Sequence, residues 1–164
     1  MLSLLSRSLP RVASRISCRR SVSSMSSLEL FDALSTPSST PARVIDVRPS
    51  HEIRDVTAFN GGKSLSDYLP LSVRGSAEDF VHEIPLDSIM SGEWLDMSPD
   101  DFEDEYDFPH PLHPGAAEDQ VYIFSCKAGV RSAVAAEIFE GSGVKNCVNF
   151  VDGAAGWDSY MRSR

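Results

Sequence analysis

The stretch of residues 121–141 constrains the fold of this chain more than any other. Val121 to Ser125 is a short apolar run rich in β-branched and aromatic residues, which is typical of a buried strand. Ser132 to Glu140 has the composition of a helix, and Gly141 can end that helix. Only residues 126–131 connect the two segments. A strand that passes through so tight a turn into a helix predicts a parallel sheet covered by helices.

Cys126 stands in this turn, directly after the expected strand. The N–H groups of a tight loop and of a helix start together form a concave nest that stabilises an anion. Such a setting lowers the pKa of a cysteine below its free value of ~8.5. Cys126 is therefore our candidate nucleophile. The alternative is an inert core cysteine, since free cysteines are often buried. Cys147, inside a second apolar run, fits that alternative better.

Other segments extend the alternation of strands and helices. Ser26 to Glu29 matches a capping box, and Met97 to Phe102 matches a helix start with Ser98 as N-cap. The remaining expected elements are a buried strand at 43–49, a short helix that begins at 50–52, a strand at 145–151 and a final turn or helix at 153–160. We expect an α/β fold: a mainly parallel central sheet of about five strands with helices on both faces.

The first 26 residues have the composition of an organelle transit peptide. They include five arginines and many serines, and no acidic residue precedes Glu29. We expect residues 1–26 to be disordered or removed, and the protein to be mitochondrial, in the matrix, with a plastid as the alternative. One domain would then span residues 27–164, and residues 55–80, which lack any period, would form an insertion or a long surface loop.

Charge excludes some partners. Beyond residue 26, ten basic residues face 24 acidic ones, a formal charge of −14, which makes nucleic acid an unsuitable partner. No uncharged apolar stretch approaches the ~20 residues of a membrane span. We also expect no metal site and no cofactor, because His110 and His113 lack further ligands nearby and Gly62-Lys63-Ser64 lacks the first glycine of a phosphate-binding loop.

Several motifs taken together resemble the single-domain rhodaneses, the eukaryotic mitochondrial thiosulfate sulfurtransferases in particular. The resemblance covers most of residues 26–162. Its strongest element is Cys-Lys-Ala-Gly-Val-Arg-Ser at 126–132, after a buried strand. The supporting motifs are Val44 to Pro49 with Glu52, Ile84-Pro85-Leu86, Phe102 to Pro109, and Gly153 with Trp157.

This resemblance implies a rhodanese-like domain and a sulfurtransferase. Cys126 would take sulfane sulfur from thiosulfate or a related donor as a persulfide, and a thiol such as glutathione or thioredoxin, or cyanide, would accept it. Lys127, Ala128, Gly129, Val130, Arg131 and Ser132 would form the substrate-binding loop. Lys127 and Arg131 would hold the donor's sulfonate or stiffen the loop, and Asp46 and Arg48 would support the loop by hydrogen bonds.

Two other functions remain open. A non-catalytic module of the same fold would carry persulfide or dock on a protein. A phosphatase or arsenate reductase of the same fold is the less favoured choice, because those enzymes place five residues between cysteine and arginine, whereas this chain has four, Lys127 to Val130. The chain also departs from the rhodanese pattern after residue 55, where the usual Gly-His-Ile-Pro-Gly-Ala stretch is missing, and at Ala128, where the thiosulfate enzyme of animals has a basic residue.

Overall fold

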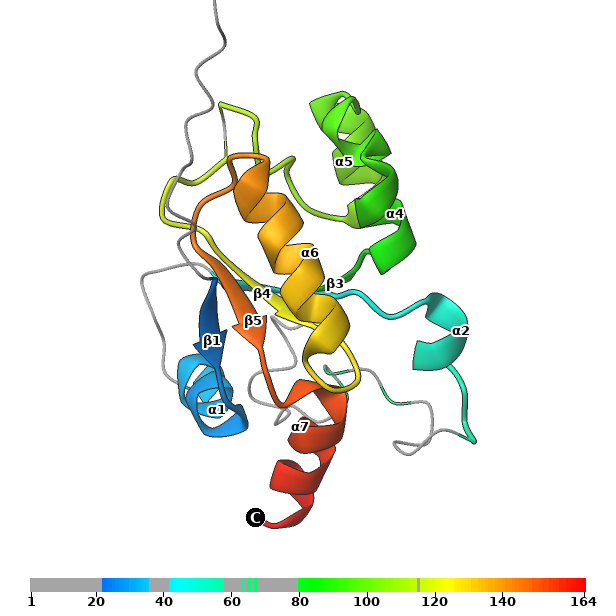
Figure 1. Ribbon diagram of the computed structural model, residues 1–164, viewed down its shortest axis with the longest axis vertical. Helices are drawn as coiled ribbons and strands as arrows, with labels where there is room; N and C mark the ends of the chain where they lie inside the picture. The colour runs from blue at the N-terminus through cyan, green and yellow to red at the C-terminus, as the bar shows by residue number, and fades with distance from the viewer. Residues whose placement is uncertain are drawn as a thin grey trace, which may run out of the picture.

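Five parallel strands form one sheet through the centre of the molecule (Figure 1). The computed structural model describes residues 22–35, 42–57, 63, 65, 67, 80–114 and 116–164. The strands lie in the order β1-β5-β4-β2-β3, and every pair is parallel. Their bounds are β1 Ser23–Met25, β2 Ala42–Asp46, β3 Val81–Glu83, β4 Val121–Ser125 and β5 Cys147–Phe150. The expected parallel sheet of an α/β protein is confirmed, and β4 is its middle strand.

Helices cover both faces of the sheet, as expected. One face carries α1 (Ser27–Ser35) and α7 (Gly153–Arg162), which contact each other. The other carries α4 (Leu86–Ser91), the 3₁₀ turn η2 (Glu93–Leu95), α5 (Pro99–Tyr106) and α6 (Val130–Gly141). The short helix α2 (Ser50–Ile53) follows β2 beyond the carboxyl edge of the sheet.

Alternating side chains along the strands divide the core between the two faces. In β2, Val44 packs into the core under α1 and α7, whereas Ile45 packs into the core under α4, α5 and α6. In β4, Ile123 and Phe124 divide in the same way. Because successive residues of a strand point to opposite faces, each strand buries both of its sides, which explains its nearly continuous apolar sequence.

Aromatic stacking fixes α6, the helix that follows the candidate site. Trp94 of η2 stacks on Phe139 of α6 with ring centroids 4.2 Å apart, and Phe124 of β4 lies with its ring centroid 4.9 Å from that of Phe139. All three side chains are buried. Stacked aromatic pairs stabilise by roughly 0.5–1.5 kcal/mol beyond their buried area, so this contact holds α6 firmly against β4.

The two predicted helix starts are confirmed. The Asp101 N–H donates to the Ser98 hydroxyl at 3.1 Å, as an N-cap requires. At α1, the Ser26 N–H donates to the Glu29 carboxylate at 2.7 Å, and the Glu29 N–H donates back to the Ser26 hydroxyl at 3.4 Å. These reciprocal bonds are the capping box that the sequence indicates.

The predicted domain boundary requires a correction. Residues 23–25, which the composition assigns to the transit peptide, form β1 and pair with β5, so the folded domain begins at or before Val22. This serine-rich strand lies at the sheet edge and has no apolar period that would reveal it. Residues 1–21 lie outside the described part of the chain, and so does most of the expected insertion at 55–80. One residue of the insertion that is described, Leu65, is buried in the core under α1 and α7.

Strand β3 and helix α4 were also not predicted. β3 has only three residues, too few to show an alternating apolar pattern. It is a strand because its backbone pairs with that of β2. Helix α4 begins directly after Pro85, which is a common first-turn signal, but its six residues are too short for a clear apolar face. Among the described residues, no helix is long and apolar enough to cross a membrane.

Candidate active site

Cys126 lies at the carboxyl end of the middle strand. It follows Ser125, the last residue of β4, and Val130 begins α6 only four residues later. The residue is 1% exposed, and so the sulfur lies at the floor of the loop rather than on its rim. Carboxyl ends of parallel strands form the usual ligand-binding edge of an open α/β sheet.

The loop's amide groups turn toward this sulfur. The backbone N–H groups of Ala128, Arg131 and Ser132 all donate to it. The Ser132 hydroxyl lies 3.4 Å from Sγ. Burial of the thiol favours its neutral form, but these donors together outweigh burial and hold the pKa of Cys126 below its ordinary value. The predicted nest of amides around the thiol is therefore present in the structure.

Donors from outside the loop bind three of its carbonyl groups. The carbonyls of Cys126 and Lys127 accept from N–H groups in the first turn of α7, those of Ala154 at 2.7 Å and Ala155 at 3.0 Å. The Gly129 carbonyl accepts from the Asn149 side chain of β5 at 3.1 Å. A peptide group that points its oxygen outward points its N–H the opposite way. The peptide group between Lys127 and Ala128 shows this directly: α7 binds its carbonyl, and its N–H, that of Ala128, donates to the sulfur.

Two glycines allow the close packing of this loop. Gly129 has φ +79°, and a Cβ there would lie 2.2 Å from the Val151 carbonyl oxygen. Gly153 has φ +60°, and a Cβ there would lie 2.6 Å from the Ala128 nitrogen. Positive φ values are unfavourable for residues with a Cβ, and both close neighbours are backbone atoms that cannot move aside easily. Glycine is required at both positions.

Cys147 provides a natural comparison within the same chain. It is 4% exposed, nearly as buried as Cys126. Its sulfur has only weak contacts with the carbonyls of Val144 and Lys145, at 3.7 and 3.9 Å. Burial therefore raises the pKa of the Cys147 thiol to about 12. The two cysteines differ in hydrogen-bond donors and not in burial, and Cys147 is the core residue that the sequence predicts.

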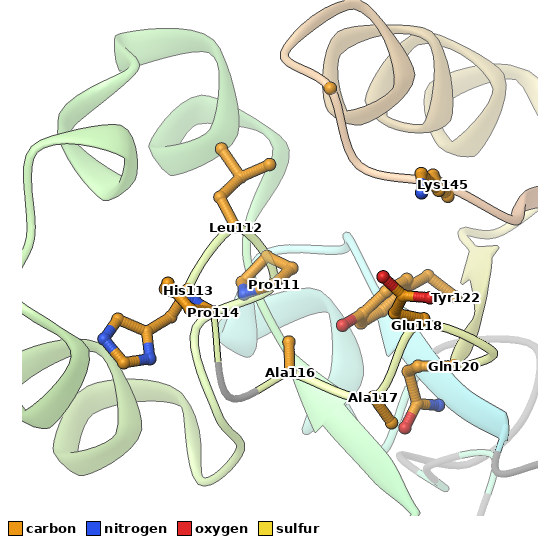
Figure 2. A pocket seen from close by; sticks show the side chains of 11 residues that line it. Pro111, Leu112, His113, Pro114, Ala116, Ala117, Glu118, Gln120, Tyr122 and Lys145 are labelled. Carbon is orange, nitrogen blue, oxygen red and sulfur yellow. The ribbon is translucent and has the colours of Figure 1, made fainter.

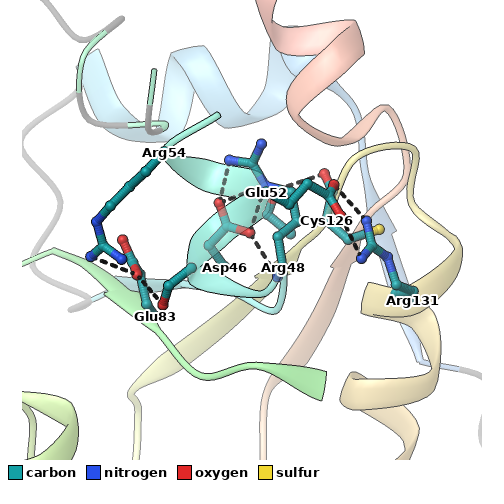
Figure 3. Close-up of polar contacts among 9 residues, drawn as sticks. Asp46, Arg48, Glu52, Arg54, Glu83, Cys126 and Arg131 are labelled. Carbon is teal, nitrogen blue, oxygen red and sulfur yellow. Dashed lines mark hydrogen bonds and ion pairs between the residues drawn. The ribbon is translucent and has the colours of Figure 1, made fainter. Parts of the chain in front are cut away.

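Arg131 forms a bidentate ion pair with Glu52 of α2 (Figure 3). The two terminal nitrogens of the guanidinium donate to the carboxylate at 2.9 and 2.8 Å. These hydrogen bonds lower the pKa of Glu52, and they raise that of Arg131. Of the two roles considered for Arg131, sulfonate binding and loop stiffening, this geometry favours stiffening, because both terminal nitrogens are already bonded.

Asp46 and Arg48 form a second, fully buried ion pair beside the loop (Figure 3). Arg48 Nη2 lies 2.6 Å from one carboxylate oxygen, and its Nε also donates to Asp46. The expected hydrogen bonds from these side chains to the loop are not formed: Arg48 Nε and Nη2 bond to Asp46, and buried Nη1 has no partner. They support the site indirectly: the residue between them, Val47, donates its N–H to the Ser125 carbonyl at 2.8 Å.

The other predicted site residues line the outer side of the loop or its base. Lys127, Ala128 and Val130 are exposed, whereas Gly129 and Ser132 are buried and both bond to Asn149 of β5. The sequence indicates Glu52 only through the family resemblance and gives no role to Asn149 or to the amides of α7. No sequence signal ties those groups to a loop so many residues away. The described residues contain no cluster of side chains suited to a metal ion.

A separate hollow of about 250 Å³ lies near the opposite, amino end of β4 (Figure 2). Its walls come from residues 111–114, 116–118 and 120 and from Gly143 and Lys145, with Tyr122 at its side. It is distinct from the Cys126 loop, which lies beyond the other end of the same strand.

The sheet order, the two helical layers and a cysteine loop between β4 and α6 define the rhodanese fold, and solved structures share it. The Saccharomyces cerevisiae single-domain sulfurtransferase RDL2 is 19% identical with a TM-score of 0.58, covering 86% of this chain and 92% of its own. The human single-domain sulfurtransferase TSTD1 is 22% identical with a TM-score of 0.54, covering 85% and 96%.

A third similar structure is a Rhodopseudomonas palustris protein of unknown function described as a possible tyrosine phosphatase. It is 17% identical with a TM-score of 0.51, covering 85% of this chain and 82% of its own. No family model matches the sequence, and no curated protein sequence matches it significantly. At these identities the neighbours establish the rhodanese fold, which sulfurtransferases share, and leave the reaction to be argued from the site.

Proposed function

We propose that this protein is a sulfurtransferase that moves sulfane sulfur from thiosulfate or a related donor to a thiol or cyanide through a persulfide on Cys126. One observation carries the proposal: three loop amides and a serine hydroxyl surround a single buried sulfur whose pKa they lower. Four hydrogen-bond donors around one sulfur suit this loop to stabilise a sulfur anion. Two similar structures, of RDL2 and TSTD1, are described as sulfurtransferases, in keeping with that chemistry.

In the first half-reaction, the Cys126 thiolate attacks the outer sulfur of the donor. The sulfur–sulfur bond of thiosulfate breaks, sulfite leaves with its electron pair, and a persulfide forms on the enzyme. The lowered pKa of Cys126 supplies the thiolate. Donors fixed in advance around a developing anion are typically worth ~3 kcal/mol each, so the loop backbone would provide most of the catalysis.

In the second half-reaction, the acceptor attacks the terminal sulfur of the persulfide. The sulfur–sulfur bond of the persulfide breaks, and its electron pair stays on Cys126, which becomes a thiolate again. The product is thiocyanate when the acceptor is cyanide, and a new persulfide when the acceptor is a thiol. Both half-reactions place negative charge on sulfur within the same ring of amides. The cradle therefore serves each step without rearrangement.

Exposed Lys127 is the residue we assign to an anionic donor. The domain carries a formal charge of −14, so a dianion such as thiosulfate needs local positive charge on approach. Lys127 stands at the mouth of the loop, where the donor's sulfonate would lie.

The direct test is the formation of thiocyanate from thiosulfate and cyanide by the purified protein. We expect turnover by the native chain, none by Cys126→Ser, and nearly native turnover by the matched control Cys147→Ser. Full activity in Cys126→Ser would refute the mechanism. A chain that takes up sulfur on Cys126 without turning over would instead be the non-catalytic carrier, the alternative from another functional class.

Phosphatase activity is the second alternative, because one similar structure is described as a possible tyrosine phosphatase. Two features oppose it. The loop has four residues between Cys126 and Arg131, and the arginine donates both terminal nitrogens to Glu52 rather than leaving them for a phosphoryl group. We expect no hydrolysis of p-nitrophenyl phosphate under conditions that give thiocyanate. The compartment we propose is the mitochondrial matrix, from the composition of the first 26 residues.

A further inference from the structure

Asn149 of β5 bonds the cysteine loop at two points. Its Nδ2 donates to the Gly129 carbonyl at 3.1 Å, and its Oδ1 accepts from the Ser132 hydroxyl at 2.7 Å. The same hydroxyl lies 3.4 Å from Cys126 Sγ. Asn149 is 8% exposed and Ser132 is fully buried, so these contacts are shielded from bulk water.

The orientation of the Asn149 amide follows from its partners. A backbone carbonyl can only accept, so the NH₂ end of the amide must face Gly129. The oxygen end must then face Ser132. This leaves one hydroxyl proton and two acceptors, the amide oxygen and the sulfur, because a serine hydroxyl has a single hydrogen to donate.

Which acceptor takes the hydroxyl proton depends on the charge of the sulfur. A neutral thiol carries its own hydrogen and needs no donor, and the 2.7 Å contact places the serine proton on the side of Asn149. A thiolate or a persulfide anion attracts every available donor, and hydrogen bonds to an ionised group are about twice as strong as neutral ones. The proton must then turn from the amide oxygen to the sulfur.

We propose that Asn149 is a positioning residue that holds the Ser132 hydroxyl beside the sulfur and competes with it for the single hydroxyl proton. Stabilisation of the sulfur anion by Ser132 therefore occurs at the expense of the bond to Asn149. Asn149 thereby limits how far Ser132 stabilises the thiolate. This preserves the nucleophilicity of the sulfur, since an anion that accepts more hydrogen bonds is a weaker nucleophile. The inference rests on the proposed role of Cys126 as the reacting thiol.

The charged groups near the sulfur would not be altered by substitutions at Asn149 or Ser132. They are Arg131 of α6, paired with Glu52 of α2, the Asp46–Arg48 pair after β2, and Lys127 in the loop. The Asn149 side chain bonds instead to the neutral groups of Gly129 and Ser132. Substitutions at positions 149 and 132 therefore change the hydroxyl proton and its partners while the surrounding charges stay in place.

The test is the pH dependence of Cys126 alkylation by iodoacetamide, measured in the Cys18→Ser, Cys147→Ser background so that Cys126 is the one cysteine left to react. Asn149→Ala should move the midpoint of the profile to lower pH by about half a unit to one unit, because the hydroxyl is then committed to the sulfur. Ser132→Ala should move it to higher pH. The double variant should match Ser132→Ala alone, since Asn149 acts through the hydroxyl.

Other outcomes overturn the proposal. If Asn149→Ala moves the alkylation midpoint to higher pH, and by the same amount when Ser132 is also replaced, then Asn149 acts only through its bond to the Gly129 carbonyl. An unchanged midpoint would mean that the two acceptors do not compete. If Asn149→Ala fails to fold by circular dichroism, Asn149→Leu fills the space without hydrogen bonds and carries the same expectation. Because alkylation needs no sulfur donor, failure of sulfur transfer leaves this measurement valid.

Discussion

At the scale of single residues, the two described cysteines show that hydrogen-bond donors and not burial decide thiol chemistry here. Both side chains are buried in the core under α4, α5 and α6. The amides of the loop and the Ser132 hydroxyl lower the pKa of Cys126, whereas burial without donors raises that of Cys147 to about 12. The sequence predicts this contrast correctly, because Cys126 precedes a glycine-containing turn and Cys147 stands within an apolar run.

This contrast predicts different alkylation profiles for the two thiols. A lowered pKa means that the thiolate persists as pH falls, so Cys126 should react with iodoacetamide at pH values where an unperturbed thiol with a pKa of ~8.5 is mostly protonated. Cys147 should stay unmodified until the protein unfolds. Peptide mapping after labelling across a pH series measures both rates. Equal labelling of the two cysteines would contradict the account.

At the scale of elements, the cysteine loop depends on partners that are remote in sequence. The strand, the turn and the helix at 121–141 could be predicted because apolar pattern, glycine and helix formers are local signals. The donors that orient the loop could not be predicted, since they come from β5 and from the start of α7. Arg131 illustrates the same limit: an arginine at this position could be noted from the sequence, but its partner Glu52 lies 79 positions earlier, on α2.

The glycine at the loop's tightest contact gives a prediction at this scale. Gly129→Ala combines a positive φ with a Cβ 2.2 Å from the Val151 carbonyl oxygen, so we expect it to lower the free energy of unfolding by about 2 kcal/mol or more and to slow sulfur transfer. Gly141→Ala is the matched control, since no atom lies within 4 Å of its Cβ. It should be neutral or stabilising by up to about 1 kcal/mol. Urea denaturation measures both, and equal effects would count against this packing of the loop.

At the scale of the whole molecule, the sheet order places the cysteine loop in the middle and β1 at one edge. A middle strand has neighbours on both sides, which suits a site that must stay rigid. The edge strand β1 escaped prediction because Ser23 and Ser24 have neither apolar pattern nor strong strand propensity. Its pairing is decided by β5, which offers an open row of backbone groups, and by half-buried Met25, which packs under α1 and α7.

Truncation tests the contribution of this edge strand. A chain beginning at residue 22 keeps β1, whereas a chain beginning at residue 26 loses it but keeps the Ser26 cap of α1. We expect the shorter chain to be less stable by about 1–3 kcal/mol, from lost strand hydrogen bonds and the lost packing of Met25. Identical urea midpoints for the two chains would mean that β1 adds nothing to stability, in keeping with the domain of residues 27–164 that the sequence alone predicts.

The central claim is that the loop stabilises a sulfur anion on Cys126, and mass spectrometry after treatment with a sulfur donor tests it most directly. The full chain, incubated with thiosulfate or with a small hydropersulfide, should gain ~32 Da, one sulfur, on the peptide that contains Cys126. A thiol reductant should remove this mass, and Cys126→Ser should not acquire it. Absence of the added sulfur with both donors, or its appearance on Cys147 instead, would contradict the account.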